Sequence, residues 1–262
     1  MRLYWELARL GFRRAAAYRG ATYAGVLTNT VFGFMISFVQ LALFAGRTRV
    51  AGYDVSDALT YVWVSQGMLA TISVMASWQE IALRVRTGDV ATDFHRPVDF
   101  QGYWLAQDIG RAGYHALFRG IPPLLIACLF FHLRFPASPL TWAAFGLSLL
   151  LGICISFSLR FLVNLVSFWI VDHRGVLSIC SFSWPFLSGM YGIPLGYLPD
   201  PIYRVVAILP FASMGQAPLS VFLEKPGPIA TLALQAAWVV ALLLLGRLVL
   251  ARAERRLVVQ GG

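Results

Sequence analysis

Lysine is almost absent from this chain of 262 residues, in which Lys225 is the only one. Lys225 is followed by Pro226 and Gly227, so it cannot be the lysine of the GxxxxGK[ST] loop that cradles nucleotide phosphates. If a process that involves this protein uses ATP, another chain must hydrolyse the ATP.

Charged residues are also scarce, at 13% of the chain against roughly 25% in a soluble domain. Hydrophobic residues reach 58%, and the mean hydropathy is +0.69. The net charge of +9 comes almost wholly from arginine. On a soluble protein this excess would suggest a nucleic-acid partner, but in so apolar a chain we attribute it to membrane orientation and expect no nucleic acid.

Motifs of metal and acyl-transfer chemistry are missing as well. The sequence has no HExxH pair, and Asp99 follows His95 at a spacing one residue short of the HxxxxD pattern of acyltransferases. The three cysteines are too far apart for a CxxC motif and are expected to be small buried hydrophobes: Cys128, Cys154 and Cys180. We therefore expect no enzymatic activity, no metal and no cofactor in this chain itself.

Long apolar runs dominate what is present. Six of them are long enough to cross a bilayer: about 21–45, 58–78, 117–135, 140–159, 175–198 and 228–250. None of the acidic residues falls in the middle of a run, which disfavours an ion-coupled carrier, because such carriers place a carboxylate within the membrane. The predicted fold class is an all-α polytopic membrane protein with six transmembrane helices in one domain, 1–262.

Proline and glycine predict irregular geometry in two of these spans. Pro122 and Pro123 should kink or delay the third helix, because proline lacks a backbone N–H and its ring clashes with the preceding turn. The fifth span should break in its second half, where several such residues gather: Pro185, Gly189, Gly192, Pro194 and Gly196.

Two segments outside the spans also carry patterns. Residues 1–20 predict a helix in the membrane interface, because their charged residues share one helical stripe; a frayed cytosolic tail is the alternative. Residues 199–227 contain two apolar pieces, about 202–209 and 217–223, that are too short to cross. Their separation by proline and glycine predicts a re-entrant outer hairpin.

The arginines set the orientation. With both termini in the cytosol, sixteen of the twenty-one basic residues lie inside or at the inner edge, which obeys the positive-inside rule. The five others are Arg47, Arg49, Arg134, Arg204 and Lys225. We expect a multi-pass protein of the plasma (inner) membrane.

The longest polar segment, 79–111, then lies in the cytosol. Its first part alternates charged with apolar residues, and Thr87 or Asp89 could cap a short helix that stops before Pro97. Such a helix is suited to a groove on another protein, whereas an ordinary solvated loop is the alternative.

Several short motifs are spread over nearly the whole chain. They are Glu80, Arg86-Thr87-Gly88-Asp89, Arg96-Pro97-Val98, Ser188-Gly189, Ile193-Pro194-Leu195, Leu209-Pro210-Phe211 and the terminal Val259-Gln260-Gly261-Gly262. Together they resemble the permease subunits of type-2 ATP-binding-cassette (ABC-2 type) exporters, and the closest branch is the viologen-exporter-like one. Phe94 departs from the pattern, which has an aliphatic residue before the Arg-Pro pair.

The resemblance implies a six-span permease that pairs with a second permease, identical or paralogous, and receives two ABC ATPase subunits. ATP and magnesium would bind in those partners. It also implies an N-terminal interfacial helix, a cytosolic coupling helix within 79–111 and an outer re-entrant segment at 199–227. The coupling residues would be Glu80, Arg86, Gly88, Asp89, Arg96 and Pro97. The outer gate would be shaped by Ser188, Gly189, Pro194, Pro199 and Pro210.

The expected function is therefore drug efflux or export of an amphipathic or cationic small molecule or a lipid-like metabolite. Aromatic residues in the spans favour such a substrate: Trp63, Phe157, Phe168, Trp169, Phe182 and Trp184. Two alternatives stay open, namely an ATP-independent channel or carrier and a membrane assembly factor. Membrane lipids are expected partners in each case.

Overall fold

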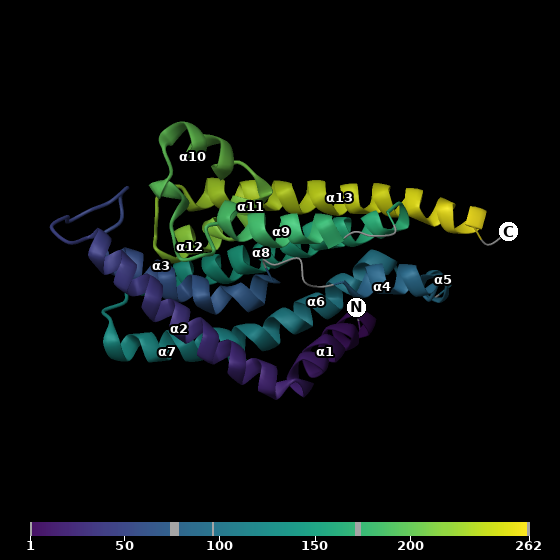
Figure 1. The fold of residues 1–262 in the computed structure, drawn as a ribbon, viewed down its shortest axis with the longest axis horizontal. Coiled ribbons are helices and arrows are strands. Elements are labelled where there is room, and N and C mark those ends of the chain that lie inside the picture. The colour runs from purple at the N-terminus through teal and green to yellow at the C-terminus, as the bar shows by residue number, and fades with distance from the viewer. Residues whose placement is uncertain (1, 74–78, 96, 171–173, 261–262) are drawn as a thin grey trace.

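The chain folds as an elongated bundle of helices (Figure 1). We describe it from a computed structural model that places residues 2–73, 79–95, 97–170 and 174–260. Within these ranges the structure contains helices and no β-strand, apart from one bridge between Val50 and Tyr53. The predicted all-α class is confirmed.

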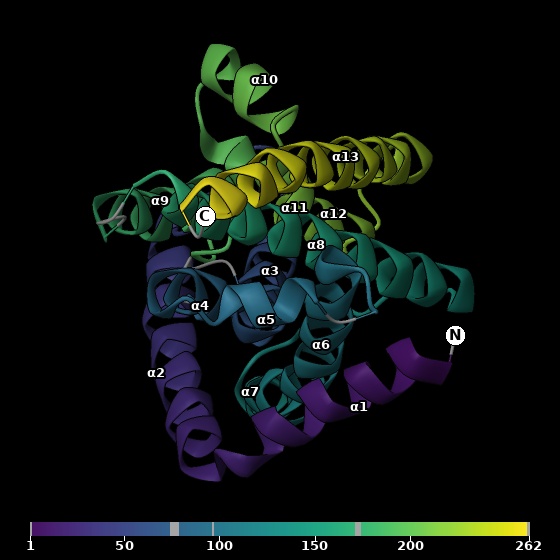
Figure 2. The same ribbon diagram turned by 90° about the vertical axis from the view of Figure 1, so that its right-hand side faces the viewer.

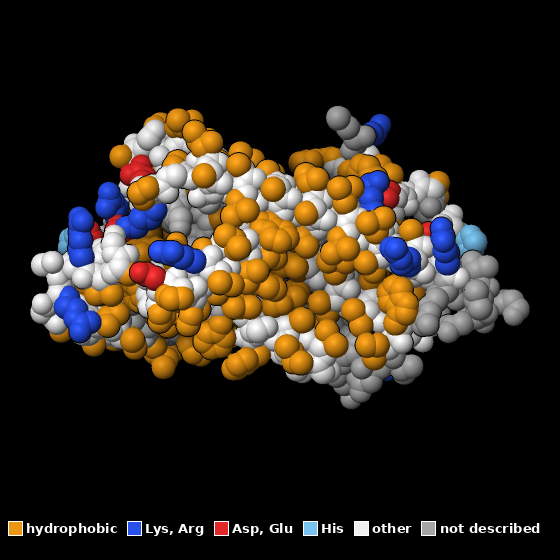
Figure 3. Space-filling view, turned by 90° about the horizontal axis from the view of Figure 1, so that it is seen from above, with side chains coloured by type: hydrophobic (Ala, Val, Ile, Leu, Met, Phe, Trp, Pro, Cys, Tyr) orange, Lys and Arg blue, Asp and Glu red, His pale blue; other side chains and the backbone are white. Residues whose placement is uncertain are grey.

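Among the residues that the structure describes, four helical runs are long and apolar enough to cross a bilayer. They are α2 (Arg19–Leu43), the run Phe100–Phe130, the run Pro139–Phe168 and most of α13 (Pro228–Gln260). The run Pro139–Phe168 is α8 (Pro139–Leu165) followed by the short η3 (Val166–Phe168). Figure 3 agrees with this assignment, since on the face that it shows apolar side chains cover the middle and charged ones gather toward the two ends.

The run Phe100–Phe130 corresponds to the predicted third span but begins earlier than residue 117. It consists of α6 (Phe100–His115), the π-helical turn η2 (Ala116–Gly120) and α7 (Ile121–Phe130). Pro122 and Pro123 lie in the first turn of α7, and the wider turn of η2 precedes them. The chain thus accommodates the two missing N–H donors by a local change of helix type.

The second and fifth predicted spans do not form single helices long enough to cross within the described residues. In the second, α3 (Val55–Met68) passes into a π-helical turn, η1 (Leu69–Ser73), and residues 74–78 lie outside the described residues. In the fifth, α9 (Arg174–Leu187) ends halfway, so the predicted break is confirmed. The total of six spans stays a prediction.

The N-terminal helix α1 (Arg2–Ala17) crosses α6 at very short range (Figures 1 and 2). A Cβ built on Gly11 would lie 2.0 Å from the Gln107 carbonyl oxygen, and one on Gly110 would lie 1.7 Å from that of Ala8. The two backbones can approach this closely only because glycine has no side chain. The predicted helix is present, while its position in a membrane interface stays a prediction.

Three short helices fill most of the segment 199–227: α10 (Asp200–Ala207), α11 (Pro210–Met214) and α12 (Gln216–Phe222). Both α11 and α12 pack against α8 and α13, whereas α10 projects from the bundle (Figure 1). Pro199 is the N-cap residue of α10, and Pro210 begins α11. The two predicted apolar pieces are therefore helical, and their re-entrant path stays a prediction.

Two further short helices, α4 (Glu80–Thr87) and α5 (Val90–Phe94), lie at the opposite end of the bundle from α10 and α12 (Figure 1). Figure 2 looks at this end and shows α4 and α5 in front of the helices of the bundle, with the C-terminal end of α13 nearby. The predicted coupling segment and the predicted outer gate thus lie at opposite ends of the molecule.

Candidate functional site

The coupling segment is a helical hairpin that turns at Gly88. Gly88 ends α4 with φ +81°, in the left-handed region that favours glycine. Asp89 holds the N-cap position of α5, but its carboxylate accepts a hydrogen bond from the Thr87 hydroxyl at 2.7 Å instead of capping a backbone N–H. The short helix predicted before Pro97 is thus two helices joined by two residues, Gly88 and Asp89.

An ion pair holds the two helices of the hairpin together. Arg84 on α4 donates from Nη2 to Asp93 Oδ1 on α5 at 2.8 Å, and its Nε donates to the other carboxylate oxygen. Asp93 is buried, and this hydrogen-bonded carboxylate raises the pKa of the Arg84 guanidinium. The ion pair therefore links α4 to α5 directly.

Aromatic packing attaches the hairpin to the bundle. The ring of Phe94 lies 4.9 Å from that of Phe100 on α6 and 6.5 Å from that of Phe168 on η3, measured between centroids. Ile81 and Val90 belong to the same buried cluster. Phe94, the residue that departs from the family pattern, therefore holds the hairpin against α6 and η3.

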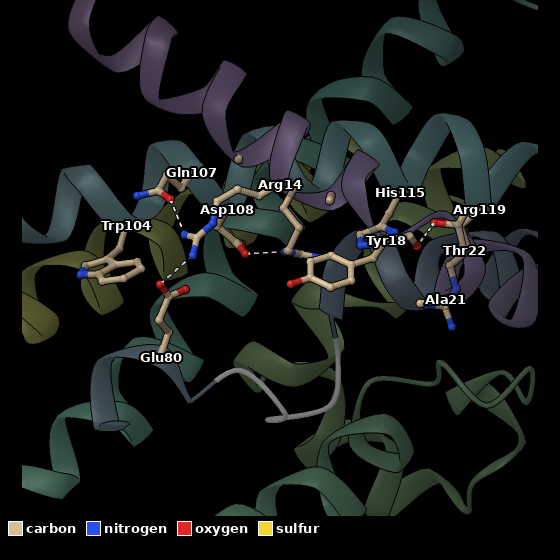
Figure 4. Close-up of a pocket in the computed structure, with 13 residues that line it drawn as sticks. Arg14, Tyr18, Ala21, Thr22, Glu80, Trp104, Gln107, Asp108, His115 and Arg119 are labelled. Atoms are coloured by element: carbon tan, nitrogen blue, oxygen red, sulfur yellow. Dashed lines mark hydrogen bonds and ion pairs between the residues drawn. The ribbon is translucent and has the colours of Figure 1, made fainter. Parts of the chain in front are cut away.

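The predicted coupling residues are distributed over this hairpin and the turn that follows. Arg86, Gly88, Asp89 and Pro97 are exposed, whereas Glu80 is half-buried. Arg96 lies outside the described residues. Glu80 opens α4 and pairs with Arg14 of α1 at 3.1 Å (Figure 4). The exposed residues are accessible to a partner, and their coupling role stays a prediction.

Asn164 connects the hairpin to the interior of the bundle. Its Oδ1 accepts a hydrogen bond from the backbone N–H of Ala82 on α4 at 3.1 Å, and its Nδ2 donates to the Arg160 carbonyl at 2.8 Å. Asn164 and Arg160 are both buried on α8. A shift of α4 would therefore act directly on the last turns of α8.

A buried ion cluster lies next along this path. Asp108 on α6 accepts hydrogen bonds from Arg160 Nη2 at 2.7 Å and from Arg111 Nε at 2.8 Å. The side chains of Arg160 and Asp108 are only 1% and 5% exposed. Burying such charges is costly unless they are paired and hydrogen-bonded, as they are here.

Sequence reasoning missed this cluster. Asp108 lies in the first third of the run Phe100–Phe130, because this helical run begins inside the segment 79–111 that was predicted to be polar. Arg160 was expected near a membrane interface, yet it is fully buried. The sequence did contain one indication of the cluster: Arg160 lies in a long apolar stretch, and an arginine in such a place needs a partner.

Arg111 also connects the cluster to the π-helical turn at the end of the second predicted span. Arg111 Nη1 and Nη2 donate to the carbonyl oxygens of Ala70 and Thr71 at 2.8 and 3.2 Å, both within η1. The turns η1 and η2 meet beside a glycine pair, where a Cβ on Gly67 would lie 2.9 Å from the Gly120 oxygen. Non-α turns at a crossing of helices are common at functional sites.

At the opposite end, Gln216 is the centre of a polar network beside the predicted outer gate. Its Oε1 accepts hydrogen bonds from the Tyr61 hydroxyl at 2.5 Å and the Leu195 N–H at 3.1 Å. Its Nε2 donates to the Tyr53 hydroxyl at 3.1 Å. The Gly189 carbonyl lies 2.9 Å from the same Tyr61 hydroxyl.

The five predicted gate residues lie at this end. Ser188 is buried and donates from its hydroxyl to the Pro185 carbonyl at 3.1 Å, whereas Gly189 has φ +72°. Pro194 and Pro210 are buried, and Pro199 is exposed. Gly189 and Pro194 also line an apolar cavity of about 430 Å³ bounded by α9, α10 and the turn η4 (Leu195–Tyr197). Their role in gating stays a prediction.

The lysine that is unique in this sequence is also fixed at this end. Lys225 Nζ lies 2.6 Å from Asp57 Oδ2 and 4.3 Å from the ring centre of Tyr53. Burial raises the pKa of Tyr53 to about 12. Arg134 pairs with the same carboxylate at 3.3 Å, so Asp57 ties three separate segments together.

Two other expectations need correction. Cys128 is exposed instead of buried, because it lies on an outward face of α7, while Cys154 and Cys180 are half-buried. Most of the aromatic residues expected to meet a substrate are instead buried in the packing of this chain: Trp63, Phe157, Phe168 and Trp184. Trp169 and Phe182 are the accessible ones.

The fold and these sites define a multi-pass membrane protein with an exposed helical hairpin at one end and a glycine- and proline-rich region at the other. Comparison with protein families agrees: residues 27–261 match the model described as ABC-2 family transporter protein. The chain therefore belongs to the ABC-2 transporter membrane family, the permease component of an ABC transporter. No curated protein matches the chain.

Proposed function

We propose that this chain is the permease subunit of an ATP-driven exporter. Two copies, or one copy and a paralogue, enclose the substrate pathway, and two separate ATPase subunits bind ATP and magnesium. Each ATPase docks on the exposed face of the hairpin α4–α5, which carries Arg86, Gly88 and Asp89.

One observation supports this proposal most strongly: an unbroken set of hydrogen bonds leads from the hairpin into the bundle. It passes from Ala82 through Asn164 to Arg160, then through Asp108 to Arg111 and the carbonyls of η1. Coupling between distant sites travels through such packed and hydrogen-bonded contacts. A push on α4 would thus reach α8, α6 and the end of α3 together.

The glycine- and proline-rich end of the molecule supports the proposed substrate class. The 430 Å³ cavity beside Gly189 and Pro194 is lined almost entirely by apolar side chains, including Phe186 and Ile202. This lining supports a substrate with an apolar part, such as an amphipathic or cationic small molecule or a lipid-like metabolite. The viologen-exporter-like branch and drug efflux fit such a substrate.

The arginines support the proposed location. Their distribution in the sequence supports cytosolic termini in the plasma membrane. The hairpin would then face the cytosol, where the ATPase subunits are, and the Gln216 network would face outward.

A pair of glycine substitutions tests the coupling role. Gly88 and Gly46 have nearly the same backbone, φ +81° and +75°, and neither has a neighbour within 4 Å of a built Cβ. Alanine at either position costs about 1 kcal/mol of backbone strain. Gly88→Ala should reduce permease-dependent ATP hydrolysis in the reconstituted complex severalfold, whereas Gly46→Ala should leave it unchanged.

Two outcomes would contradict the proposal. One is that no ATPase co-purifies with the permease, and the other is that the complexes with either variant hydrolyse ATP at the rate of the wild-type complex. Substrate movement in vesicles that lack any ATPase would instead favour a channel or an ATP-independent carrier. Binding of partners with no transport at all would favour an assembly factor.

A further inference from the structure

Residues 188–199 connect α9 to α10, and we call this segment the α9–α10 loop. The short turn η4 is its regular part, and its backbone is left-handed at Gly189 and Gly192, with φ +72° and +76°. A loop of this kind keeps a fixed position mainly through contacts with its neighbours. Two glutamines from different helices supply such contacts.

Gln216 on α12 contacts the loop at one side. Its Oε1 accepts a hydrogen bond from the Leu195 N–H at 3.1 Å and lies 2.5 Å from the Tyr61 hydroxyl. That hydroxyl also lies 2.9 Å from the Gly189 carbonyl oxygen, and its single proton serves one of these two acceptors at a time. The Nε2 of Gln216 donates to the Tyr53 hydroxyl at 3.1 Å. Gln216 thus holds the loop directly at Leu195, and Tyr61 adds a second point at Gly189.

Gln40 on α2 contacts the loop at two further points. Its Nε2 donates to the Gly192 carbonyl oxygen at 3.1 Å, and its Oε1 accepts a hydrogen bond from the Tyr197 hydroxyl at 3.3 Å. Gln40 is 3% exposed, so its amide needs partners inside the protein. The loop packs closely here, since a Cβ built on Gly192 would lie 3.2 Å from Cγ2 of Ile36 on α2. Both polar ends of a buried side chain are therefore used on this loop.

The loop residues held in this way also form the wall of the apolar cavity of about 430 Å³. Gly189, Leu195 and Tyr197 all line that cavity. The glutamines do not line it, so they contact the loop without contacting the content of the cavity. Breaking the hydrogen bonds of the two glutamines would consequently free part of the cavity wall to move.

Ionic contacts hold the neighbouring segments at this end of the molecule. Asp57 pairs with Lys225 at 2.6 Å and with Arg134 at 3.3 Å, and none of these three residues belongs to the α9–α10 loop. A hydrogen bond between neutral groups is weaker than a charged one, so it breaks and forms again at lower cost. The loop is thus attached by the weaker bonds to a scaffold that charged pairs hold together.

We propose that Gln40 and Gln216 are positioning residues of the outer gate. Their side-chain amides hold the α9–α10 loop against α2 and α12, and export requires these hydrogen bonds to break so that the loop can move. This inference rests on the proposed export function. The two glutamines act through the loop and do not touch the substrate.

Hydrogen–deuterium exchange of the purified full-length permease tests the attachment of the loop. Gln40→Met and Gln216→Met keep an unbranched side chain and remove both polar groups. Exchange in peptides that cover 188–198 should be about tenfold faster in Gln40→Met, which loses two hydrogen bonds to the loop, and severalfold faster in Gln216→Met, which loses one. Unchanged exchange of the loop in both variants would overturn the proposal.

Gln235→Met is the matched control. Gln235 is a buried glutamine on α13 whose amide bonds to Ser148 and Ser213, outside the loop. Its replacement should lower the melting temperature and leave exchange of the loop unchanged. If Gln40→Met fails to fold, Tyr197→Phe removes one of the same hydrogen bonds and keeps the ring.

ATP hydrolysis without added substrate tests the gating role in the reconstituted complex. Conformational steps often limit turnover, so a loosened loop should raise this hydrolysis severalfold in Gln40→Met and Gln216→Met but not in Gln235→Met. Faster exchange of the loop with unchanged hydrolysis would show that the loop is not the gate. A wild-type complex without ATP-driven transport would instead contradict the proposed function, while the exchange experiment would still decide whether the glutamines hold the loop.

Discussion

Arg160 on α8 and Asp108 on α6 form a buried ion pair with Nη2 and Oδ2 2.7 Å apart. The two residues are far apart in the sequence and belong to two different runs that could cross a bilayer. Arg111 shares the carboxylate, and the Ser156 hydroxyl accepts a hydrogen bond from Arg160 Nε at 3.2 Å. The pair therefore fixes how α6 and α8 sit against each other.

Removing one partner should destabilise the permease strongly. Asp108→Asn leaves the buried Arg160 without its counterion, which costs about 3–5 kcal/mol, and Arg160→Leu should cost less because Arg111 still pairs with Asp108. Thermal unfolding of the purified protein in detergent measures the effect. The control is Arg247→Gln, because Arg247 and Asp99 are 3.9 Å apart and largely exposed, and such pairs contribute about 0–1 kcal/mol. Equal melting temperatures for all three variants would show that the buried pair contributes no stability.

The crossing of α1 and α6 predicts opposite effects for two glycines on one helix. Gly110→Ala places a methyl group 1.7 Å from the Ala8 oxygen, so the helices must separate at a cost of about 1–3 kcal/mol. Gly113→Ala meets nothing within 4 Å and should be neutral or stabilise by up to about 1 kcal/mol, because alanine favours the helix. Thermal unfolding of both variants makes the comparison. A stable Gly110→Ala protein with α1 still docked on α6 would refute the close contact.

Tyr53 predicts a loss of stability at alkaline pH. Its pKa is raised by burial to about 12, from an ordinary value near 10.0, because the buried site disfavours the phenolate. The folded protein thus keeps this proton while the unfolded chain loses it. The contribution is fully present below about pH 10 and falls by roughly 2–3 kcal/mol as the pH rises to about 12.

The difference in tyrosinate absorbance between the wild type and Tyr53→Phe isolates this group. We expect the difference to titrate near pH 12 in the folded state. The stability of Tyr53→Phe should decline less steeply than that of the wild type above pH 10. A Tyr53 that titrates near its ordinary pKa would mean that its ring is solvated in the native protein.

The sequence alone predicted the helical class and the main apolar runs. The reason is physical: a bilayer requires about twenty apolar residues in a helix, so composition and length carry the signal without any tertiary contact. The break after Leu187 was also predictable, since glycine and proline act locally. The turn at Gly88 was not predicted, since a single short helix was expected where the structure has two.

The candidate site was only partly predictable. The residues of the hairpin could be chosen by their pattern, but Asp108 was assigned to a polar segment because α6 begins earlier than the apolar run suggests. Arg119 was counted among the basic residues inside or at the inner edge of the membrane. The residues next to it in the sequence do not predict that it packs against a glycine of α2. Contacts between residues that are distant in the sequence produce no periodic pattern, so the sequence alone does not predict them.

Local chemistry determined where this protein has helices, turns and cationic segments, because each depends on neighbouring residues and on the solvent around them. Tertiary structure alone decided that Asn164, Arg160 and Asp108 lie in one path from the hairpin, and that two glutamines of different helices contact one loop. Those facts depend on how whole helices pack, and packing is set by shape and charge across the bundle rather than along the chain.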